Sequence, residues 1–140
     1  MSEQKFKIAS QFIQALPHSV ALGMTLTDMG EGTAEITMPY ADHLIGDPET
    51  GVIHGGAVSA LMDTCGGAAV MAHADAAFGT ATIDLRIDYM RAATPGQAIR
   101  ARAECYHVTR SVAFVRATAM DDDEANPVAA ATGAFTMERV

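Results

Sequence analysis

The sequence is organised around residues 51–74, which read GVIHGGAVSALMDTCGGAAVMAHA. Asp63 is the only formally charged residue in this segment. Burying a carboxylate among apolar residues is costly, so its position indicates a specific role. A turn at Gly55 and Gly56, followed by helix-forming residues, predicts a buried central helix whose first backbone amides are free to bind a ligand. The segment is too short and too interrupted to span a bilayer.

Composition excludes several classes of protein. The chain has 140 residues, of which 49% are hydrophobic, and this suits one globular domain over 1–140. A net charge of -8 argues against nucleic acid as a partner, because phosphate backbones need a basic surface. The first ten residues, MSEQKFKIAS, have no signal-peptide core, so a cytoplasmic protein without membrane attachment is expected.

The cysteines and histidines suggest neither a disulfide framework nor a metal site. Two cysteines, Cys65 and Cys105, are too few for a framework, and Cys65 is better interpreted as a small buried hydrophobe than as a nucleophile. The histidines lack ligand-like spacing: His18, His43, His54, His73 and His107. We therefore expect no metal and no cofactor.

The remaining elements predict an α+β fold. Residues 1–16 form an amphipathic helix, with Phe12 and Leu16 among its apolar positions, and we expect it to pack on the domain. Residues 24–29 and 33–38 are predicted to be two strands around a glycine turn, or one long bent strand, and further strands are predicted over 80–89, 97–109, 112–120 and 128–138. Residues 41–50 are expected to form a polar loop, and 121–127 a solvated acidic hairpin loop. The order predicts a curved antiparallel sheet wrapped around a long central helix.

Two stretches carry a resemblance to a known family. GVIHGGAVSALMDTCGGAA and TATIDLRIDYMRAATPG resemble the hotdog-fold acyl-CoA thioesterases of the phenylacetic-acid-degradation (PaaI-like) family. The likeness extends over 22–137 and is sharpest over 54–63 and 82–95. Its most specific feature is the HGG motif at His54, followed after six residues by Asp63, because this spacing joins a turn, a helix start and a carboxylate.

The resemblance implies a reaction and its catalytic residues. Thioester hydrolysis needs a group that activates water or attacks the carbonyl, and a group that stabilises the oxyanion. By resemblance, Asp63 is the general base or nucleophile, the backbone amide of Gly55 polarises the carbonyl, and Thr82 orients the water or the carboxylate. The family also pairs two chains, so that Asp63 of one faces Gly55 of the other, and homodimers joining into homotetramers are implied.

Further residues are assigned to substrate binding. His54 and Gly56 belong to the helix start, where His54 has an orienting role. Many relatives have an asparagine where this chain has Pro48, which offers no side-chain hydrogen bond, so Asp47, Glu49 or Thr50 must replace it or the site holds its water differently. Coenzyme A, here part of the substrate, requires local cations, for which Arg91 and Arg110 are candidates, with a solvated role for each as the alternative. Candidates for an acyl pocket are Met24, Leu44, Met62 and Tyr89.

Other interpretations remain open at this point. Without the resemblance, a structural role for Asp63 at a subunit interface is as compatible with the sequence as a catalytic role. Hotdog hydratases and dehydratases use a differently spaced motif, and a non-catalytic acyl-CoA-binding protein is a third possibility. Within the thioesterase interpretation, aromatic and medium-chain acyl groups both fit the sequence, as do a covalent anhydride and direct attack by water.

Overall fold

The computed structural model describes residues 3–77 and 79–140. In chain order its elements are α1 (Glu3–Ala15), α2 (Pro17–Ala21), β1 (Thr25–Gly30), β2 (Thr33–Met38), the 3₁₀-helix η1 (Asp42–Leu44), β3 (Ile45–Asp47), β4 (Val52–Ile53), α3 (Gly55–Met71), β5 (Thr82–Tyr89), β6 (Ile99–Val108), β7 (Val112–Met120) and β8 (Ala129–Thr136). The predicted strands and the central helix are all present, with ends that differ by a few residues.

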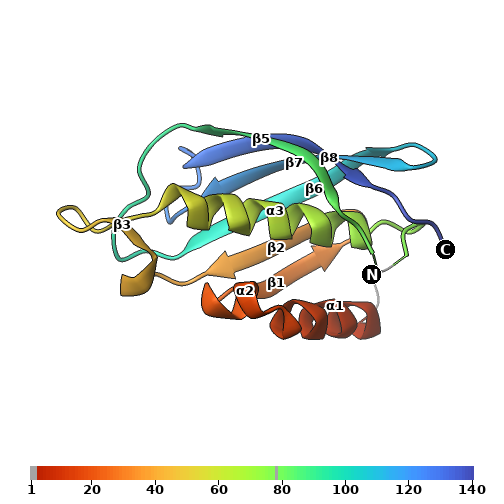
Figure 1. The fold of residues 1–140 in the computed structure, drawn as a ribbon, viewed down its shortest axis with the longest axis horizontal. Helices are drawn as coiled ribbons and strands as arrows, with labels where there is room; N and C mark the ends of the chain where they lie inside the picture. Colours follow the sequence, from red (N-terminus) through yellow and green to blue (C-terminus); the bar gives the residue numbers. More distant parts are fainter. Residues whose placement is uncertain (1–2, 78) are drawn as a thin grey trace.

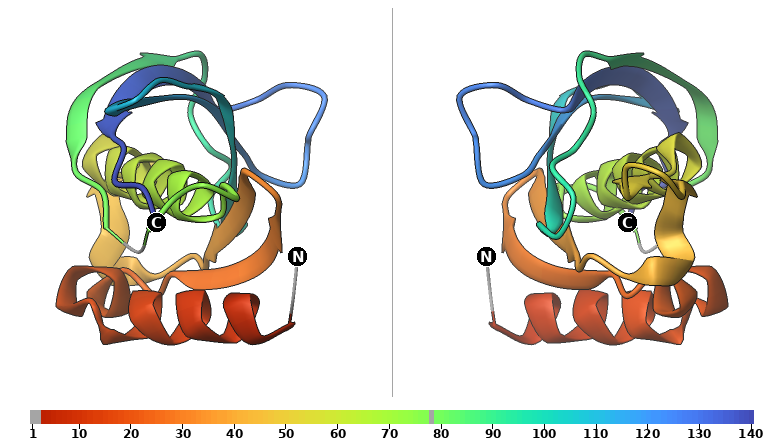
Figure 2. Two further views of the ribbon diagram at one scale, coloured as in Figure 1. Left: turned by 90° about the vertical axis from the view of Figure 1, so that its right-hand side faces the viewer. Right: turned by 90° about the vertical axis from the view of Figure 1, so that its left-hand side faces the viewer.

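The main sheet has six strands in the order β1-β2-β6-β7-β8-β5, and every neighbouring pair is antiparallel. Figure 1 shows α3 lying along this sheet, and the end-on views of Figure 2 show the sheet curving around the helix. The predicted α+β arrangement, a curved sheet wrapped around a long helix, is therefore confirmed.

Small residues on the concave face of the sheet allow α3 to pack closely. The inward positions of β6 and β7 are mostly alanine: Ala101, Ala103, Ala113, Ala117 and Ala119. On the helix, Gly66 faces Phe135 of β8, and a Cβ there would lie 2.7 Å from Phe135 Cζ. Because interiors are close-packed, a larger residue at Gly66 would push the helix off the sheet.

The N-terminal helix is confirmed from Glu3 to Ala15, while residues 1 and 2 of the predicted segment lie outside the described residues. Pro17 does not simply end this helix, because it opens α2 at a first-turn position that tolerates proline. Ala9 and Ile13 are buried, and α1 packs against β1 (Figure 1).

Residues 41–50 were expected to be a loop, and this was wrong in part. η1 and β3 lie within them, and β3 pairs with β4, with Ile45 opposite Ile53. The hairpin passes close to the start of α3, since a Cβ on Gly46 would lie 2.7 Å from His54 Cα. Glycine permits this close approach of two backbones.

The prediction that residues 121–127 form a solvated loop is wrong for Asp121, which is 0% exposed. Its carboxylate accepts hydrogen bonds from both terminal nitrogens of Arg91, at 2.8 and 2.6 Å. It also accepts from the backbone amides of Thr94 and Asp123. A buried carboxylate is tolerated when it is paired and hydrogen-bonded in this way. The pair joins the segment after β5 to the loop between β7 and β8.

Replacing Asp121 with Asn is expected to lower the melting temperature at neutral pH by roughly 5–10 °C, because Arg91 then loses its ionised partner. The hydrogen bonds from Arg91 hold the pKa of Asp121 well below its usual range. A lowered pKa stabilises the folded state above the unfolded value, about 3.9, and that contribution is lost as the pH falls toward the folded value. Thermal melts should therefore differ most above pH 5, and the difference should shrink progressively as the pH falls below 4 toward the folded-state pKa. Asp122→Asn, at an exposed neighbour, is the control and should leave the melting temperature unchanged.

Candidate active site

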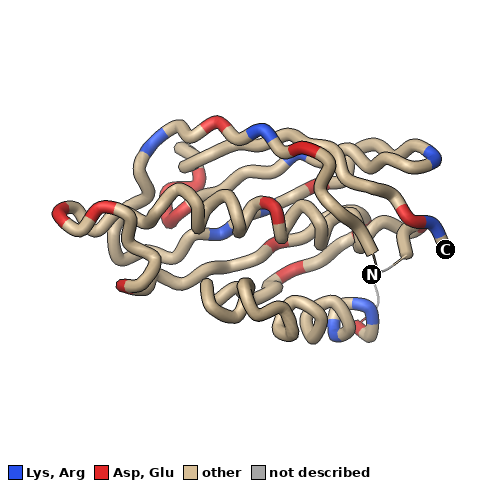
Figure 3. The backbone as a smooth tube through the Cα atoms, in the orientation of Figure 1, with Lys and Arg blue, Asp and Glu red and all other residues tan. Residues whose placement is uncertain are grey.

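Asp63 and Thr82 are brought together by α3 and β5. Asp63 is the only charged residue of α3, as Figure 3 also shows, and it lies in the middle of the helix. The hydroxyl of Thr82, at the start of β5, donates to Asp63 Oδ1 at 2.5 Å. The bond fixes one carboxylate oxygen and leaves the other available for chemistry.

This pair opens onto a cavity of about 290 Å³. The cavity lies between α1, the C-terminal half of α3 and the segment that leads into β5. Its lining residues are Phe12 and Ile13 of α1, Leu16 between α1 and α2, Asp63, Thr64, Gly67 and Met71 of α3, and Gly79, Thr80, Thr82 and Phe135. A half-buried carboxylate at an apolar cavity is a common arrangement for a ligand or reaction site.

The start of α3 presents a free backbone amide. His54 is the N-cap, and its Nδ1 accepts from the amide of Gly56 at 2.8 Å. Within the described part of the chain, the amide of Gly55 has no hydrogen-bond acceptor. Because it stands at the positive end of a 17-residue helix, it can bind a carbonyl oxygen or an oxyanion. His54 therefore caps the helix start, while its predicted roles in orienting and binding substrate stay predictions.

Two residues, Tyr89 and Ser59, hold the first turn of α3 in place through contacts that the sequence did not predict. Tyr89, at the end of β5, donates its hydroxyl to the carbonyl of Gly55 at 2.9 Å. Ser59 donates to the same carbonyl at 3.1 Å and contacts the Tyr89 hydroxyl. These contacts lie beside a second cavity, of about 310 Å³, which both Gly55 and Tyr89 line. A tyrosine near the end of an expected strand carried no sequence signal for this contact.

Asp63 and Gly55 do not meet within one chain. They are eight positions apart in α3, and a rise of 1.5 Å per residue separates them by roughly 12 Å along the helix axis. The two cavities correspondingly share no lining residue. One chain therefore carries both expected catalytic groups, but at two separate places.

The sequence of the helix and the strands around it matches a known family model. The model is that of the thioesterase superfamily, and the match extends over residues 50–128. The chain belongs to the thioesterase superfamily. The matched range holds His54, Gly55, Asp63 and Thr82, so the superfamily assignment covers the candidate site.

This thioesterase-superfamily chain is also similar to individual proteins of known sequence or structure. It is 37% identical over 75 residues to a candidate esterase from Halobacterium salinarum, a match that covers 51% of this chain. The chain spans about half the length of that curated relative, 50% of which is aligned. A protein of solved crystal structure from Pseudomonas aeruginosa is 40% identical, with a TM-score of 0.86, 96% of this chain covered and 99% of the other.

The hotdog fold is shown by a more distant structure. The PaaI protein of the Escherichia coli phenylacetic acid degradation operon superposes with a TM-score of 0.85 at 20% identity, covering 98% of this chain and 95% of that chain. This confirms that the fold is the hotdog arrangement expected from the resemblance. Among residues 3–77 and 79–140, no helix combines the length and the apolar character needed to cross a membrane.

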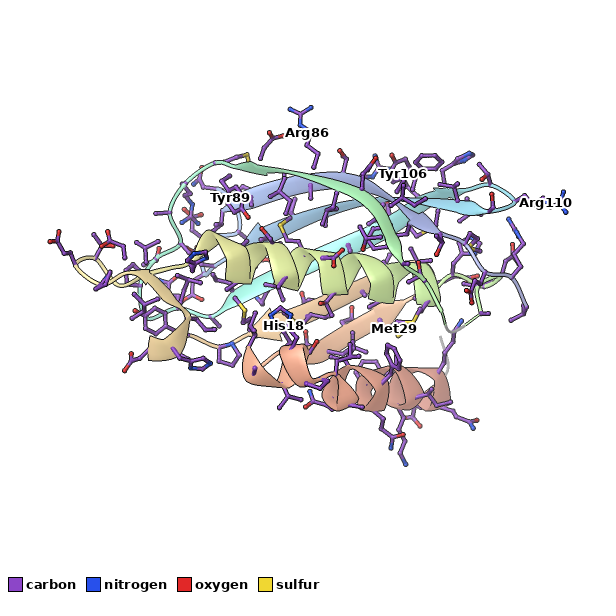
Figure 4. The ribbon with its side chains drawn as sticks, in the orientation of Figure 1. His18, Met29, Arg86, Tyr89, Tyr106 and Arg110 are labelled. Atoms are coloured by element: carbon purple, nitrogen blue, oxygen red, sulfur yellow. The ribbon has the colours of Figure 1, made fainter. Side chains whose placement is uncertain are left out.

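The two arginines assigned to coenzyme A lie in different environments. Arg91 lines the cavity beside Gly55, but its guanidinium donates to Asp121 and to the carbonyls of Asn126, Ala92 and Asp123. Arg110 lies at the β6–β7 turn, and Figure 4 shows it at the opposite end of the sheet from Tyr89. Phosphate binding by either arginine stays a prediction.

The segment expected to replace the family asparagine forms the tip of the β3–β4 hairpin. Asp47 accepts from the amide of Glu49 at 3.0 Å and from the hydroxyl of Thr50 at 2.9 Å. Asp47 and Thr50 are thus engaged in closing the turn, while Pro48 and Glu49 are exposed. Substrate binding by Pro48, Glu49 or Gly56 stays a prediction.

Several other predicted positions belong to the core of the domain. Met24, Leu44 and Met62, expected to line an acyl pocket, are instead closed into the core at 6% exposure or less. Tyr89, the fourth residue expected there, is half exposed and lines the cavity beside Gly55. Cys65 is fully buried, and burial raises the pKa of its thiol to about 12. Burial also raises the pKa of Cys105. Within the described residues, no three His, Cys, Asp or Glu side chains are grouped to hold a metal.

Proposed function

We propose that this protein is an acyl-CoA thioesterase that hydrolyses an aromatic or medium-chain acyl-CoA to the free acid and coenzyme A. The observation that carries the proposal is the pair of Asp63 and Thr82 at an apolar cavity in a thioesterase-superfamily chain. The cavity can receive an acyl group while the free carboxylate oxygen faces the thioester carbon.

Each group has a distinct task in the proposed reaction. Thr82 holds Asp63 in one orientation through its hydrogen bond. Asp63 takes a proton from water as the water attacks the carbonyl, or attacks the carbonyl itself to give an anhydride that water then cleaves. The Gly55 amide stabilises the oxyanion, since the helix N-terminus favours negative charge. The C–S bond breaks, the thiolate leaves and is protonated, and the acid is released.

The proposal requires two chains, because Asp63 and Gly55 lie at different places in one chain. β5 supports a pairing of chains, since it is the last strand at one edge of the sheet and, among the described residues, no strand pairs with its outer edge. Three large apolar side chains on or beside it are half exposed: Ile83 at 55%, Tyr89 at 50% and Met90 at 53%. We propose that β5 and the exposed side of α3 meet a second copy, in a homodimer that further assembles into a homotetramer.

The proposed activity is tested by thiol release from a panel of acyl-CoAs: acetyl, octanoyl, phenylacetyl, 4-hydroxybenzoyl and succinyl. Release from the octanoyl or aryl substrates is expected, with a rate that scales with enzyme concentration. Tight binding of acyl-CoA without release would instead identify a non-catalytic binding protein. Hydration of a 2-enoyl-CoA without thiol release would identify a hydratase.

A further inference from the structure

We propose that α1 and Gly67 form the wall of an acyl-binding subsite beside Asp63, and that they determine which acyl groups the protein accepts. The ligand class is an uncharged, apolar acyl group. This inference rests on the proposed thioesterase function and extends it, because it assigns selectivity to a helix outside the matched residues 50–128.

The composition of the cavity defines the ligand class. Five of its lining side chains are large and apolar: Phe12, Ile13, Leu16, Met71 and Phe135. Among the described residues that line it, none is Lys, Arg or His, and Asp63 is the only charged one. A carboxylate on the acyl group would lose its hydration in this cavity without gaining a cation as a partner, which is unfavourable. It would also lie near the carboxylate of Asp63, which would repel it.

Gly67 leaves open space at the base of this cavity. A Cβ at Gly67 would meet only Thr80 Cγ2 at 3.6 Å and Phe135 Cε2 at 4.0 Å, which are ordinary contacts. Its neighbour Gly66 differs, since a Cβ there would lie 2.7 Å from Phe135. Close packing thus explains Gly66 but not Gly67. The space beside Gly67 belongs to the cavity that Asp63 lines.

α1 supplies the opposite wall. Its buried residues Ala9 and Ile13 anchor the helix to the domain, while Phe12 remains 46% exposed and lines the cavity. An exposed phenylalanine beside a carboxylate and an apolar cavity is placed to cover an acyl group that enters there. Leu16, the residue that links α1 to α2, continues the same wall.

The test compares wild type with Gly67→Ala and Phe12→Ala on the acyl-CoA panel. Gly67→Ala adds one methyl group inside the cavity, so kcat/KM for octanoyl- or phenylacetyl-CoA should fall by roughly tenfold relative to acetyl-CoA. Its melting temperature should be equal to or higher than that of wild type, because alanine favours the helix. Phe12→Ala should shift the ratio of octanoyl to acetyl turnover by a similar factor, and wild type should turn over succinyl-CoA poorly.

Ile8→Ala is the matched control on α1. Ile8 is 44% exposed, close to the value for Phe12, but lines a different surface hollow. It should leave the ratio of octanoyl to acetyl turnover unchanged.

The outcomes separate this inference from the proposed function. Equal changes for every acyl-CoA in Gly67→Ala and Phe12→Ala, or succinyl-CoA turnover matching octanoyl-CoA, would overturn the subsite while leaving thioesterase activity intact. If wild type releases no thiol, the proposed function fails and the subsite is judged by binding. In that case the ratio of octanoyl-CoA to acetyl-CoA affinity must fall in Gly67→Ala, and an unchanged ratio overturns the subsite.

Discussion

Asp63→Asn is expected to lower kcat for acyl-CoA hydrolysis by about 10²–10⁴-fold, the range found when a positioned acid-base group is lost. Asparagine has the same shape, and its carbonyl oxygen can still accept the hydrogen bond from Thr82, so the fold should persist. The amide cannot take a proton from water and is a poor nucleophile. Thiol release under saturating substrate measures kcat, and calorimetry of acyl-CoA binding to the variant should give a dissociation constant close to the wild-type KM.

Asp28→Asn provides the matched control for this substitution. Asp28 is exposed on β1 and does not line the cavity of Asp63. It should hydrolyse acyl-CoA at the wild-type rate. Undiminished turnover by Asp63→Asn, with a normal melting curve, would contradict the role given to this carboxylate and leave it as a structural group.

Gly55→Pro is expected to lower kcat by about 10²–10³-fold, because it removes the amide hydrogen that would bind the oxyanion. Proline is well tolerated at the first position of a helix, which Gly55 occupies. The preceding residue, His54, has ψ 133°, which is the extended conformation that a residue before proline requires. The substitution therefore removes one donor while the helix start is preserved, and a melting curve checks this directly.

Combining the two variants tests whether the site is shared between chains. If Asp63 of one chain acts with Gly55 of the other, a mixed dimer of Asp63→Asn and Gly55→Pro chains has one doubly altered site and one intact site. Random co-assembly of equal amounts should then restore roughly a quarter of the wild-type activity. Each variant co-expressed with itself is the control and stays inactive. A mixed preparation as inactive as these controls, with mixed dimers demonstrated by two affinity tags, would rule out the shared site.

The elements of the fold were predictable because their signals are local. Alternation of apolar residues marked each strand of the main sheet, and a long apolar run with one acid marked α3. The environment of Asp121 was not predictable, since it depends on Arg91, which is 30 positions away and reaches it only in the folded sheet. In the sequence, a run of acidic residues before Asn126 and Pro127 has the composition of a solvated turn.

The candidate site likewise has some residues that the sequence predicted and others that only the structure identifies. Asp63, Gly55 and Thr82 were identified because a motif with fixed spacing resembles a family, and the Asp63–Thr82 contact is present. The position of Phe12 at the cavity could not be predicted, because the helical spacing of apolar residues indicates only that one face of α1 is apolar. Gly67 was equally hidden beside Gly66, since only the three-dimensional packing distinguishes a glycine that permits close contact from one that borders a cavity.

The burial of both cysteines has a practical consequence for these measurements. A thiol with a pKa of about 12, as at Cys65, carries almost no thiolate at neutral pH, and thiolate is the form that attacks disulfide reagents. Cys105 is also buried. A chromogenic disulfide added to the folded protein should therefore report liberated coenzyme A with little background from the polypeptide, and a rapid increase in colour before substrate is added would signal unfolding.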